Sequence, residues 1–377
     1  MRFDYTEEQR LLAESVRRFV ARDYGFEARK RVLSSPEGAS AEVWRAFADM
    51  GLLALPLPAE HGGFGGTATD LAPVMEAFGE ALVVEPFLAT VGLGAQLVAR
   101  AGNAAQQAAV LPRVADGSMK LAFAYTEVHS RYDLQRIALR AQRSGEGWVL
   151  EGEKRVVLGA PLAERIVVSA RTAGAESDPR GVSLFLVDAA APGIAQTPYR
   201  TLDGMRAADL RFSGARVGAD ALLGVEGEAL ETIEAVVDYA TALACWEAVG
   251  AMRYANEATL EYLKARKQFG VPIGTFQALQ HRMVDMMVEL EQARSMAGLA
   301  CARVEPGTPA AERRRIVSAA KIKIADACRL VSQESVQLHG GMGMTEELKV
   351  SHTFRRLTVL AQQFGDSDHH LERYAGS

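Results

Sequence analysis

Four titratable side chains crowd into one short stretch near the end of the sequence, VLAQQFGDSDHH. They are Asp366, Asp368, His369 and His370. The stretch could bind a metal ion, form an acid–base pair or begin a helix. A metal site needs supporting ligands at a recognisable spacing, and the sequence offers none. We therefore expect no metal here. Because acidic residues favour a helix N-terminus, we expect instead a short final helix capped by Asp366 or Ser367.

A second group, RKQFGVPIGTFQ at residues 266–277, combines a cation with a turn. Arg266 is a candidate anchor for an anion, because a guanidinium can donate to two phosphate oxygens at once. On spacing alone, an ordinary corner between two helices is the simpler interpretation. In that case one helix ends and the chain turns at Arg266, Phe269, Gly270 and Pro272, and the next helix opens at Phe276 and Gln277.

A third group, VQLHGGMGMTEE at residues 336–347, follows a long helical pattern. Gly340 and Gly341 would let a phosphate-bearing ligand approach backbone N–H groups. The alternative is a helix C-cap followed by a flexible turn.

The composition limits the classes of protein that can carry these groups. The chain has 377 residues, 49% hydrophobic and 24% charged, which is typical of a soluble globular protein with a large core. A net charge of −5 leaves no basic excess, so we expect no nucleic-acid partner. Three scattered cysteines without a CxxC spacing indicate a reducing compartment. The polar start and the lack of any run of roughly 18 apolar residues predict a cytoplasmic protein without a membrane association.

The hydrophobic periodicity changes twice along the chain. Residues 1–117 have a helical period, and Thr6 and Gln9 are spaced as a capping box. Residues 118–225 hold short β-branched runs between turn-forming residues, which predict an antiparallel β-domain. Residues 226–377 return to the helical period. The sequence thus predicts three domains of the α+β class: helical, β and helical.

Some elements can be predicted more closely. The β-branched runs predict strands at 147–158, 165–172, 181–189 and 209–217. One helix face is predicted to carry Met283, Met287, Leu290 and Ala297. Thr308 and Pro309 predict a helix with Pro at its first position, running to Leu338.

With this order of domains, the turn at 266–277 and the loop at 336–347 together resemble the acyl-CoA dehydrogenase family, over essentially the whole chain. The family's RxxFGxPI..FQ turn and QxxGGxGxT loop are both present. The closest likeness is to the small-subunit type of pimeloyl-CoA dehydrogenase, whose members end in a similar Phe-Gly-Asp-x-Asp-His-His segment. The resemblance implies an N-terminal helical domain, a central antiparallel β-domain and a C-terminal four-helix bundle.

The resemblance also implies a function in fatty acid metabolism. It implies FAD as cofactor, α,β-dehydrogenation of an acyl-CoA substrate, and an electron-transfer flavoprotein as electron acceptor. In this family, one subunit's turn and Gly-Gly loop bind the FAD held by its neighbour, so an oligomer is implied. The residues implied to contact the adenosine diphosphate part of FAD are Arg266, Gln268, Phe269, Gln337, Gly340 and Gly341.

The catalytic base is missing from both places where the family carries it. Dehydrogenation needs a carboxylate that removes the α-proton. The family's C-terminal Tyr-Glu-Gly-Thr loop aligns with Phe364, and its alternative position on a long helix aligns with Ala240. Asp238 lies two residues earlier on that helix, and Glu247 lies about 10 Å further along it. Glu247 is a candidate base, but it could also form a structural ion pair with an arginine such as Arg253 or one from a partner.

The predicted β-domain departs from the family as well. The flavin-holding pattern Thr-Glu-Pro-Gly-Ala-Gly-Ser-Asp corresponds here to TEVHSRYD at residues 126–133, which retains Thr126, Glu127 and Asp133. Small residues that let the flavin approach are replaced by larger ones. These are His129, Arg131 and Tyr132. The family's Trp-Ile-Thr strand reads Val-Val-Leu at 156–158, so a hydroxyl expected near flavin N5 is absent.

Three hypotheses follow. The chain could be one subunit of an α2β2 heterotetramer whose paralogous partner supplies the catalytic Glu. It could be a self-sufficient homo-oligomeric enzyme with a displaced base, Glu247. It could also be a non-catalytic subunit that binds acyl-CoA or FAD. The sequence leaves the acyl group open.

Overall fold

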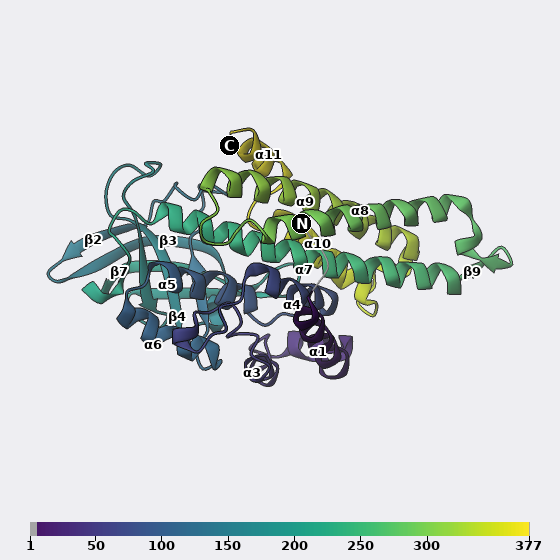
Figure 1. Ribbon diagram of the computed structural model, residues 1–377, viewed down its shortest axis with the longest axis horizontal. Coiled ribbons are helices and arrows are strands. Elements are labelled where there is room, and N and C mark those ends of the chain that lie inside the picture. Colours follow the sequence, from purple (N-terminus) through teal and green to yellow (C-terminus); the bar gives the residue numbers. More distant parts are fainter. Residues whose placement is uncertain (1–5, 377) are drawn as a thin grey trace. The chain divides into compact units, whose positions relative to one another are not determined.

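The computed structural model describes residues 6–376 as two compact units (Figure 1). Unit 1 holds the residues up to Arg31, Thr67–Val83 and the residues from Thr241 onward. Unit 2 holds Val32–Gly66 and Val84–Ala240. The predicted domain boundaries at 117/118 and 225/226 are not those of the two units, and they stay a prediction. Within residues 6–376, every helix is too short or too polar to cross a membrane.

Unit 1 is helical. Its first helix, α1 (Glu7–Asp23), begins at the predicted capping box, in which the Thr6 and Gln9 side chains each accept from the other residue's backbone N–H. The remaining helices of unit 1 are α4 (Ala68–Ala81), most of α7 (Leu230–Ala265), α8 (Gln277–Cys301), α9 (Ala310–His339), α10 (Lys349–Gln362) and α11 (Ser367–Ala375). The short helix η6 (Gly340–Met344) follows α9.

Helices α4 and α7 cross with their backbones in contact. A Cβ atom at Gly79 would lie 1.8 Å from the carbonyl oxygen of Glu247, and one at Gly250 would lie 1.8 Å from that of Glu76. Only glycine permits so close an approach. This crossing fixes the section of α7 that carries Glu247.

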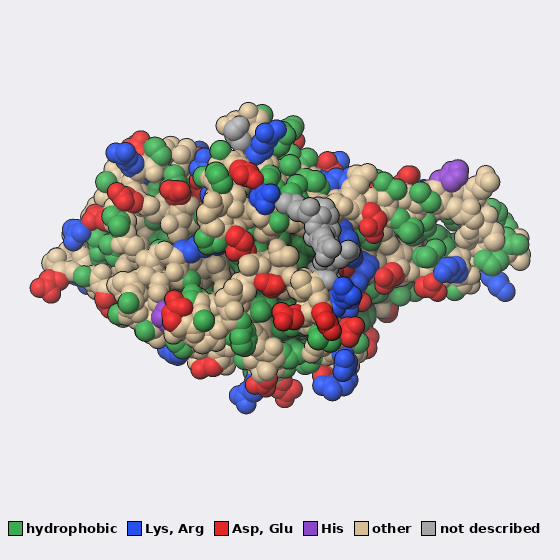
Figure 2. All heavy atoms as spheres, in the orientation of Figure 1, with side chains coloured by type: hydrophobic (Ala, Val, Ile, Leu, Met, Phe, Trp, Pro, Cys, Tyr) green, Lys and Arg blue, Asp and Glu red, His purple; other side chains and the backbone are tan. Residues whose placement is uncertain are grey.

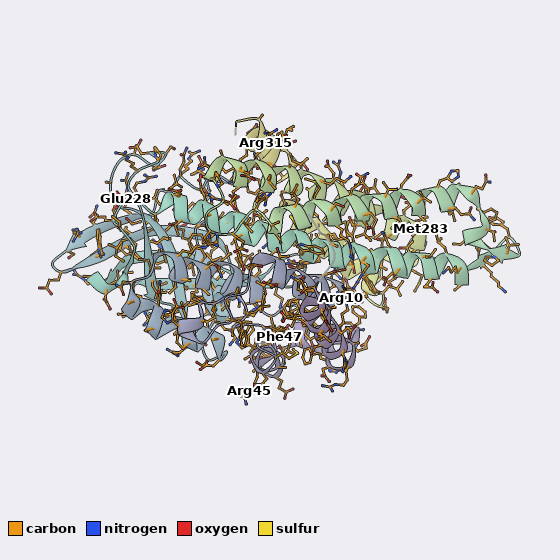
Figure 3. All side chains as sticks on the ribbon, viewed as in Figure 1. Arg10, Arg45, Phe47, Glu228, Met283 and Arg315 are labelled. Atoms are coloured by element: carbon orange, nitrogen blue, oxygen red, sulfur yellow. The ribbon has the colours of Figure 1, made fainter. Side chains whose placement is uncertain are left out.

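Helices α8 and α9 lie side by side and are joined by the ion pairs Arg282–Glu334 and Lys323–Glu289 (Figure 1). The predicted buried face of α8 is wrong at Met287, which is 53% exposed. The buried positions are Met283, Met286, Leu290, Ala293 and Ala297. They follow alternating steps of three and four residues, and Met287 lies outside this narrow stripe. Figure 3 labels Met283 on α8.

The predicted start of α9 is wrong by one residue. Pro309 has φ −55° and ψ 136°, which is extended backbone, so it occupies the N-cap position instead of the first helical position. Its fixed φ still suits the entry into the helix. The helix ends at His339, and Gly340 follows with φ 60°.

Unit 2 combines helices with a sheet. Its helices are α3 (Ala41–Asp49), α5 (Ala95–Ala101), α6 (Ala104–Ala115) and the π-helical η2 (Leu88–Gly94), while α2 (Phe26–Ser34) crosses the unit boundary. On α3, Phe47 is fully buried whereas Arg45 points away from the chain (Figure 3). Trp44 donates from its indole nitrogen to the Gly117 carbonyl, 3.0 Å away. The apolar face of α3 is therefore buried.

Within the described residues, the sheet of unit 2 has eight strands in the order β6-β7-β3-β2-β4-β5-β8, and β1 pairs with β4 off this path. The strands are β1 (Leu121–Ala124), β2 (Arg140–Ser144), β3 (Gly147–Leu158), β4 (Arg165–Arg171), β5 (Val182–Asp188), β6 (Ile194–Arg200), β7 (Arg206–Val217) and β8 (Leu222–Leu223). The four predicted strands correspond to β3, β4, β5 and β7. Strands β1, β2, β6 and β8 were not predicted, because they are short or carry charged and proline residues. The sheet is mainly antiparallel, as expected, but β1 and β2 each run parallel to β4.

Candidate functional site

The predicted anion-binding turn forms a tight hairpin at the end of α7. Strands β9 (Lys267–Gln268) and β10 (Val271–Pro272) pair in an antiparallel manner. Phe269 and Gly270 form the two-residue loop with φ 55° and 82°. Two positive φ values are typical of the tight turns that suit such hairpins, and they favour glycine over phenylalanine. The turn therefore holds Phe269 in a conformation that leaves its side chain 91% exposed.

Arg266 is positioned as a free cation beside this hairpin. Among residues 6–376, its guanidinium has no ion pair or hydrogen bond, and only its backbone takes part, with N–H donating to Tyr262 and C=O accepting from Ile273. Gln268 is also exposed, and within the described part of the chain its amide donates to the neighbouring Lys267 carbonyl alone. The side chains are therefore available to a ligand or a partner chain.

An apolar surface surrounds the hairpin and continues along α8. Figure 2 shows hydrophobic side chains around the position that Figure 1 labels β9. The exposed apolar residues are Phe269, Val271, Phe276, Val284, Met287 and Val288. Phe269 and Phe276 meet edge to face, with ring centroids 6.1 Å apart. Contiguous exposed apolar surface of this kind marks an interaction site.

The Gly-Gly loop lies at the same end of unit 1. The ring of His339, the last residue of α9, stacks on Tyr262 near the end of α7, with centroids 4.5 Å apart. Burial lowers the pKa of His339, whose Nδ1 donates to the Ser335 carbonyl 2.7 Å away. This contact brings the end of the helix that leads into the turn at 266–277 together with the start of the Gly-Gly loop.

The loop itself is open. A Cβ atom at Gly340 or Gly341 would meet nothing within 4 Å. Gln337 is exposed on the last turn of α9, and Met342 and Met344 are 48% and 66% exposed. Bare backbone at the same end of unit 1 as Arg266, whose guanidinium has no partner among residues 6–376, suits the binding of a diphosphate.

The segment where the family's C-terminal base is expected carries no carboxylate and is firmly held. Phe364 is buried with φ 65°, and Gly365 follows with φ 128°. The buried Lys321 donates from Nζ to the carbonyls of Ala361 and Gly365, at 2.9 and 2.8 Å. His370 donates from Nε2 to the Phe364 carbonyl at 3.1 Å. Three carbonyls of residues 361–365 thus have side-chain donors.

The cluster of aspartates and histidines is the start of a helix, as predicted. Asp366 is the N-cap of α11, and its carboxylate accepts from the His369 backbone N–H at 2.9 Å. No group of residues within 6–376 could hold a metal ion through His, Cys, Asp or Glu side chains. Burial, together with nearby positive charge, lowers the pKa of His370 to about 2, so this ring stays neutral.

Glu247 is buried in an ion pair, but its partner differs from the predicted one. Its Oε1 accepts from Nε of Arg356 on α10 at 2.6 Å, and both side chains are about 5% exposed. Arg253 instead bonds to Glu76 and Glu80 on α4. It turns to α4 because the fully buried Glu76 needs positive charge there. The predicted structural ion pair is therefore confirmed, with Arg356 in place of Arg253.

The other candidates on α7 lie in unit 2. Asp238 is 2% exposed and Ala240 is fully buried. Asp238 stays a candidate from the sequence alone. An apolar methyl group at Ala240 leaves the family's alternative base position without a proton acceptor.

The segment at 126–133 starts on buried polar contacts. Thr126 accepts from the Arg155 backbone N–H at 2.8 Å through its carbonyl. The Glu127 carboxylate accepts from the Ala138 and Leu139 backbone N–H groups and from Lys154 Nζ, at 2.7, 3.2 and 2.7 Å. Burial lowers the pKa of Lys154, which also donates to Ser169 at 3.0 Å. The retained Glu127 therefore shapes the base of this loop.

Sequence reasoning missed two cations in this region, Lys154 and Arg171. Each is buried, with exposures of 0% and 1%. Arg171 ends the largely apolar strand RIVVSAR, and an arginine there is the signal that could have found it. Lys154 stands in the polar run EGEKR, where nothing in the sequence marks it as buried.

Strand β3 carries an irregularity next to Lys154. The register with β7 shifts between Lys154 and Val157, and Val156 takes φ 51° with its side chain 49% exposed. Asp209 accepts from the Val156 backbone N–H at 3.0 Å and stabilises this bulge. The sequence expectation of a missing hydroxyl at residues 156–158 stays a prediction about the flavin.

Comparison with known proteins shows which family this chain is similar to. Three domain models match the chain: the acyl-CoA dehydrogenase N-terminal domain at residues 6–118, the middle domain at 122–215 and the C-terminal domain at 230–376.

Individual relatives agree with these matches. The acyl-CoA dehydrogenase FadE12 of Mycobacterium tuberculosis is 31% identical, over 93% of this chain and 90% of its own length. The solved ChsE4–ChsE5 complex of Mycobacterium tuberculosis is 26% identical with a TM-score of 0.90, over 100% of this chain and 98% of that one. An FAD complex of PigA is 25% identical with a TM-score of 0.91, again over 100% and 98%.

Proposed function

Because this chain belongs to the acyl-CoA dehydrogenase family, we propose that it is one subunit of an FAD-dependent acyl-CoA dehydrogenase whose paralogous partner supplies the catalytic Glu. The family assignment makes the protein a flavoprotein oxidoreductase that acts on the CH–CH bond of an acyl-CoA. The observation that carries the subunit proposal is chemical. Both family positions for the base hold side chains that accept no proton, Phe364 and Ala240, and both are buried.

The reaction sets three requirements. A carboxylate must remove the α-proton, a hydride must leave Cβ, and donors must stabilise the negative charge on the thioester oxygen. FAD, when bound, supplies the hydride acceptor. The chain itself must therefore bind at least part of FAD. The base must come from this chain or from a partner.

The residues of unit 1 fit the adenosine diphosphate part of FAD. The Arg266 guanidinium is unpaired among residues 6–376, and the Gly340–Gly341 backbone is open on the side where a Cβ would stand. The residues that would hold this part are Arg266, Gln268, Phe269, Gln337, Gly340 and Gly341. Arg266 would donate to phosphate oxygens, and backbone N–H groups of the glycines would complete the cradle.

The flavin part is less well matched in unit 2. Thr126 is retained and is our candidate contact from this segment. The small residues of the family pattern are replaced by His129, Arg131 and Tyr132, of which His129 and Arg131 are exposed. Bulk at these positions opposes close approach of a ring system, which supports a partner that holds the flavin.

The exposed apolar surface at the hairpin supports a partner chain. Uncovered Phe269 and Phe276 would expose a large apolar area to water, whereas an interface would bury it. ChsE4–ChsE5, a complex of two named chains, resembles this chain along its full length, which supports an unlike partner. We propose an α2β2 arrangement of the pimeloyl-CoA small-subunit type, with an electron-transfer flavoprotein as electron acceptor.

One observation favours a second candidate function. Glu247 is a buried carboxylate on α7, and buried carboxylates are rare unless paired or functional. A self-sufficient enzyme would use it as a displaced base. Its short contact with Arg356 favours the structural role instead.

The test is the visible spectrum of the purified chain, alone and co-expressed with a paralogue encoded beside it. We expect no turnover from the chain alone, and bleaching of the flavin by an acyl-CoA only in the pair. A yellow protein that bleaches by itself would overturn the subunit proposal. A pair that binds no FAD under any condition would overturn the flavoprotein assignment too.

A further inference from the structure

The segment between β1 and β2 is a long loop with an unusual composition. Residues 125–139 contain no regular secondary structure and no glycine or proline. Arg131 nevertheless takes φ 45°, a conformation that favours glycine. A loop of this length without secondary structure is usually either functional or disordered. Contacts at the base of residues 125–139 explain why this loop has a defined shape.

The two ends of the loop are joined through one carboxylate. Glu127, near the start, accepts from the backbone N–H groups of Ala138 and Leu139, near the end. Ser130 closes a turn inside the loop, since its hydroxyl accepts from the Glu127 N–H at 2.9 Å. A surface loop whose ends meet in this way is an Ω-loop, and its shape depends on the contacts at its base.

A second loop, residues 172–181, is tied to the first through Arg171. This side chain is 1% exposed, and its Nη atoms donate to four main-chain carbonyls. They are those of Gln135 at 2.5 Å, Glu176 at 2.7 Å, Asp178 at 2.8 Å and Arg180 at 2.7 Å. The Ile137 N–H also donates to the Glu176 carbonyl, and the Arg171 N–H to that of Leu139. One guanidinium thus makes a single body of two loops.

All four acceptors are backbone atoms, so this arrangement does not depend on the side chains that the loop displays. The tip can replace small residues by His129, Arg131 and Tyr132 without losing its supports. A guanidinium suits the task because its planar fork carries several donors in a fixed geometry and remains charged.

We propose that Arg171 is a positioning residue that holds the 125–139 loop in one preformed shape for FAD binding. This inference rests on the proposed function, in which Thr126 near the start of this loop, and not the bulky tip, is the candidate contact with FAD. A preformed loop loses little conformational entropy when the ligand binds, whereas a mobile loop would weaken binding by its ordering cost.

Limited proteolysis with trypsin tests the first half without any cofactor. Arg131 and Arg136 are exposed on the loop and are sites for this protease. We expect Arg171→Met to speed cleavage at these two residues by about tenfold or more, because local opening becomes easier. Arg171→Lys keeps a cation but loses the fork, so an intermediate rate is expected.

The matched control is Arg140→Met. Arg140 is exposed, pairs with Arg171 in the parallel contact of β2 and β4, and donates one bond to the Gly174 carbonyl. Among the described residues, its guanidinium bonds to the second loop and to no carbonyl of residues 125–139, so cleavage at Arg131 should match that of the wild type. Equal cleavage rates in wild type and both Arg171 variants, each with a wild-type circular dichroism spectrum, would overturn the proposal.

FAD affinity, measured on whichever assembly binds FAD in the wild type, tests the second half. We expect Arg171→Lys to weaken FAD binding by about tenfold while kcat at saturating FAD stays within about twofold. Faster cleavage with unchanged FAD affinity would refute a role toward FAD. A wild-type assembly that binds no FAD at all would instead refute the proposed function, so the two failures are distinguishable.

Discussion

Two loops of this chain are held by the same device, a buried cation that donates to main-chain carbonyls. In unit 2, Arg171 holds residues 125–139 together with 172–181. In unit 1, Lys321 holds residues 361–365, assisted by His370. In the family, the first loop faces the flavin and the second carries the base.

The two devices differ in their response to pH. A guanidinium stays charged at any ordinary pH, so the Arg171 contacts are permanent. Burial lowers the pKa of Lys321 to about 8, and no carboxylate bonds to it within the described residues. Burial likewise keeps His370 neutral. The contacts of Lys321 are therefore sensitive to pH, whereas those of Arg171 are not.

Both loops keep their supports although both have changed their displayed side chains. Phe364 stands where a catalytic Glu is expected, yet three carbonyls around it are satisfied. The loop tip at 128–132 has lost its small residues, yet Glu127 and Arg171 fix its base. The scaffold is maintained while reactive or ligand-facing groups differ, as expected for a subunit that acts together with a partner.

The largest effect is expected from breaking the buried pair of the first loop. Lys154→Met would leave the Glu127 carboxylate buried without its cation, which typically costs about 3–5 kcal/mol of unfolding free energy. Urea denaturation measures this. The double variant Glu127→Gln, Lys154→Met should recover part of the loss, since no unpaired charge remains. A double variant as unstable as the sum of the two single variants would contradict the coupling.

A smaller effect is expected in the second loop. Lys321→Met removes the donors to the Ala361 and Gly365 carbonyls, so about 1–3 kcal/mol should be lost. The exposed Lys264, which bonds only to Glu261 one helical turn earlier, provides a matched control. Lys264→Met should change the unfolding free energy by less than about 0.5 kcal/mol. Similar losses for both variants would show that the carbonyl contacts contribute nothing specific.

The pH dependence separates the two loops further. The pKa of His370 is about 2 in the folded protein, against an ordinary value of 6.5. His370 therefore binds a proton in the unfolded chain but not in the folded chain. Stability is lost as the pH falls below 6.5. Between pH 7 and pH 5 this amounts to about 2 kcal/mol.

Urea midpoints of wild type and His370→Gln across this range measure the effect. The variant keeps a donor for the Phe364 carbonyl but has no titration, so its acid loss should be smaller. The remaining loss should come from other groups, including His339 and His352, whose pKa values burial also lowers. Parallel pH curves for the two proteins would exclude His370 as a source.

The sequence was sufficient where a local rule decides the structure. The capping box at Thr6, the tight turn at Phe269 and the helix start at Asp366 each depend on residues within a few positions. The strands β3, β4, β5 and β7 were predictable for a similar reason, since β-branched runs are local.

The contacts that shape the two loops could not be predicted, because each joins residues far apart in the chain. Lys321 reaches residue 361 and Arg171 reaches residue 135 through the packing of different elements. The suggested ion pair of Glu247 with Arg253 was wrong for the same reason. Its partner Arg356 lies more than a hundred positions away, whereas Arg253 was suggested by closeness along the helix. The backbone carbonyls that a buried cation will meet cannot be identified from the sequence.

The smallest effect is expected from changing Glu247, the candidate base that lies in unit 1. If the partner supplies the catalytic Glu, Glu247→Gln should change the turnover of the assembled enzyme by less than about twofold, whereas removing a true general base costs about 10²–10⁴-fold. The amide can still accept from Arg356, so FAD binding and folding should be retained. Single-turnover flavin reduction by an acyl-CoA measures the chemical step directly. A loss of a hundredfold or more with FAD still bound would identify Glu247 as the base and remove the need for a catalytic partner.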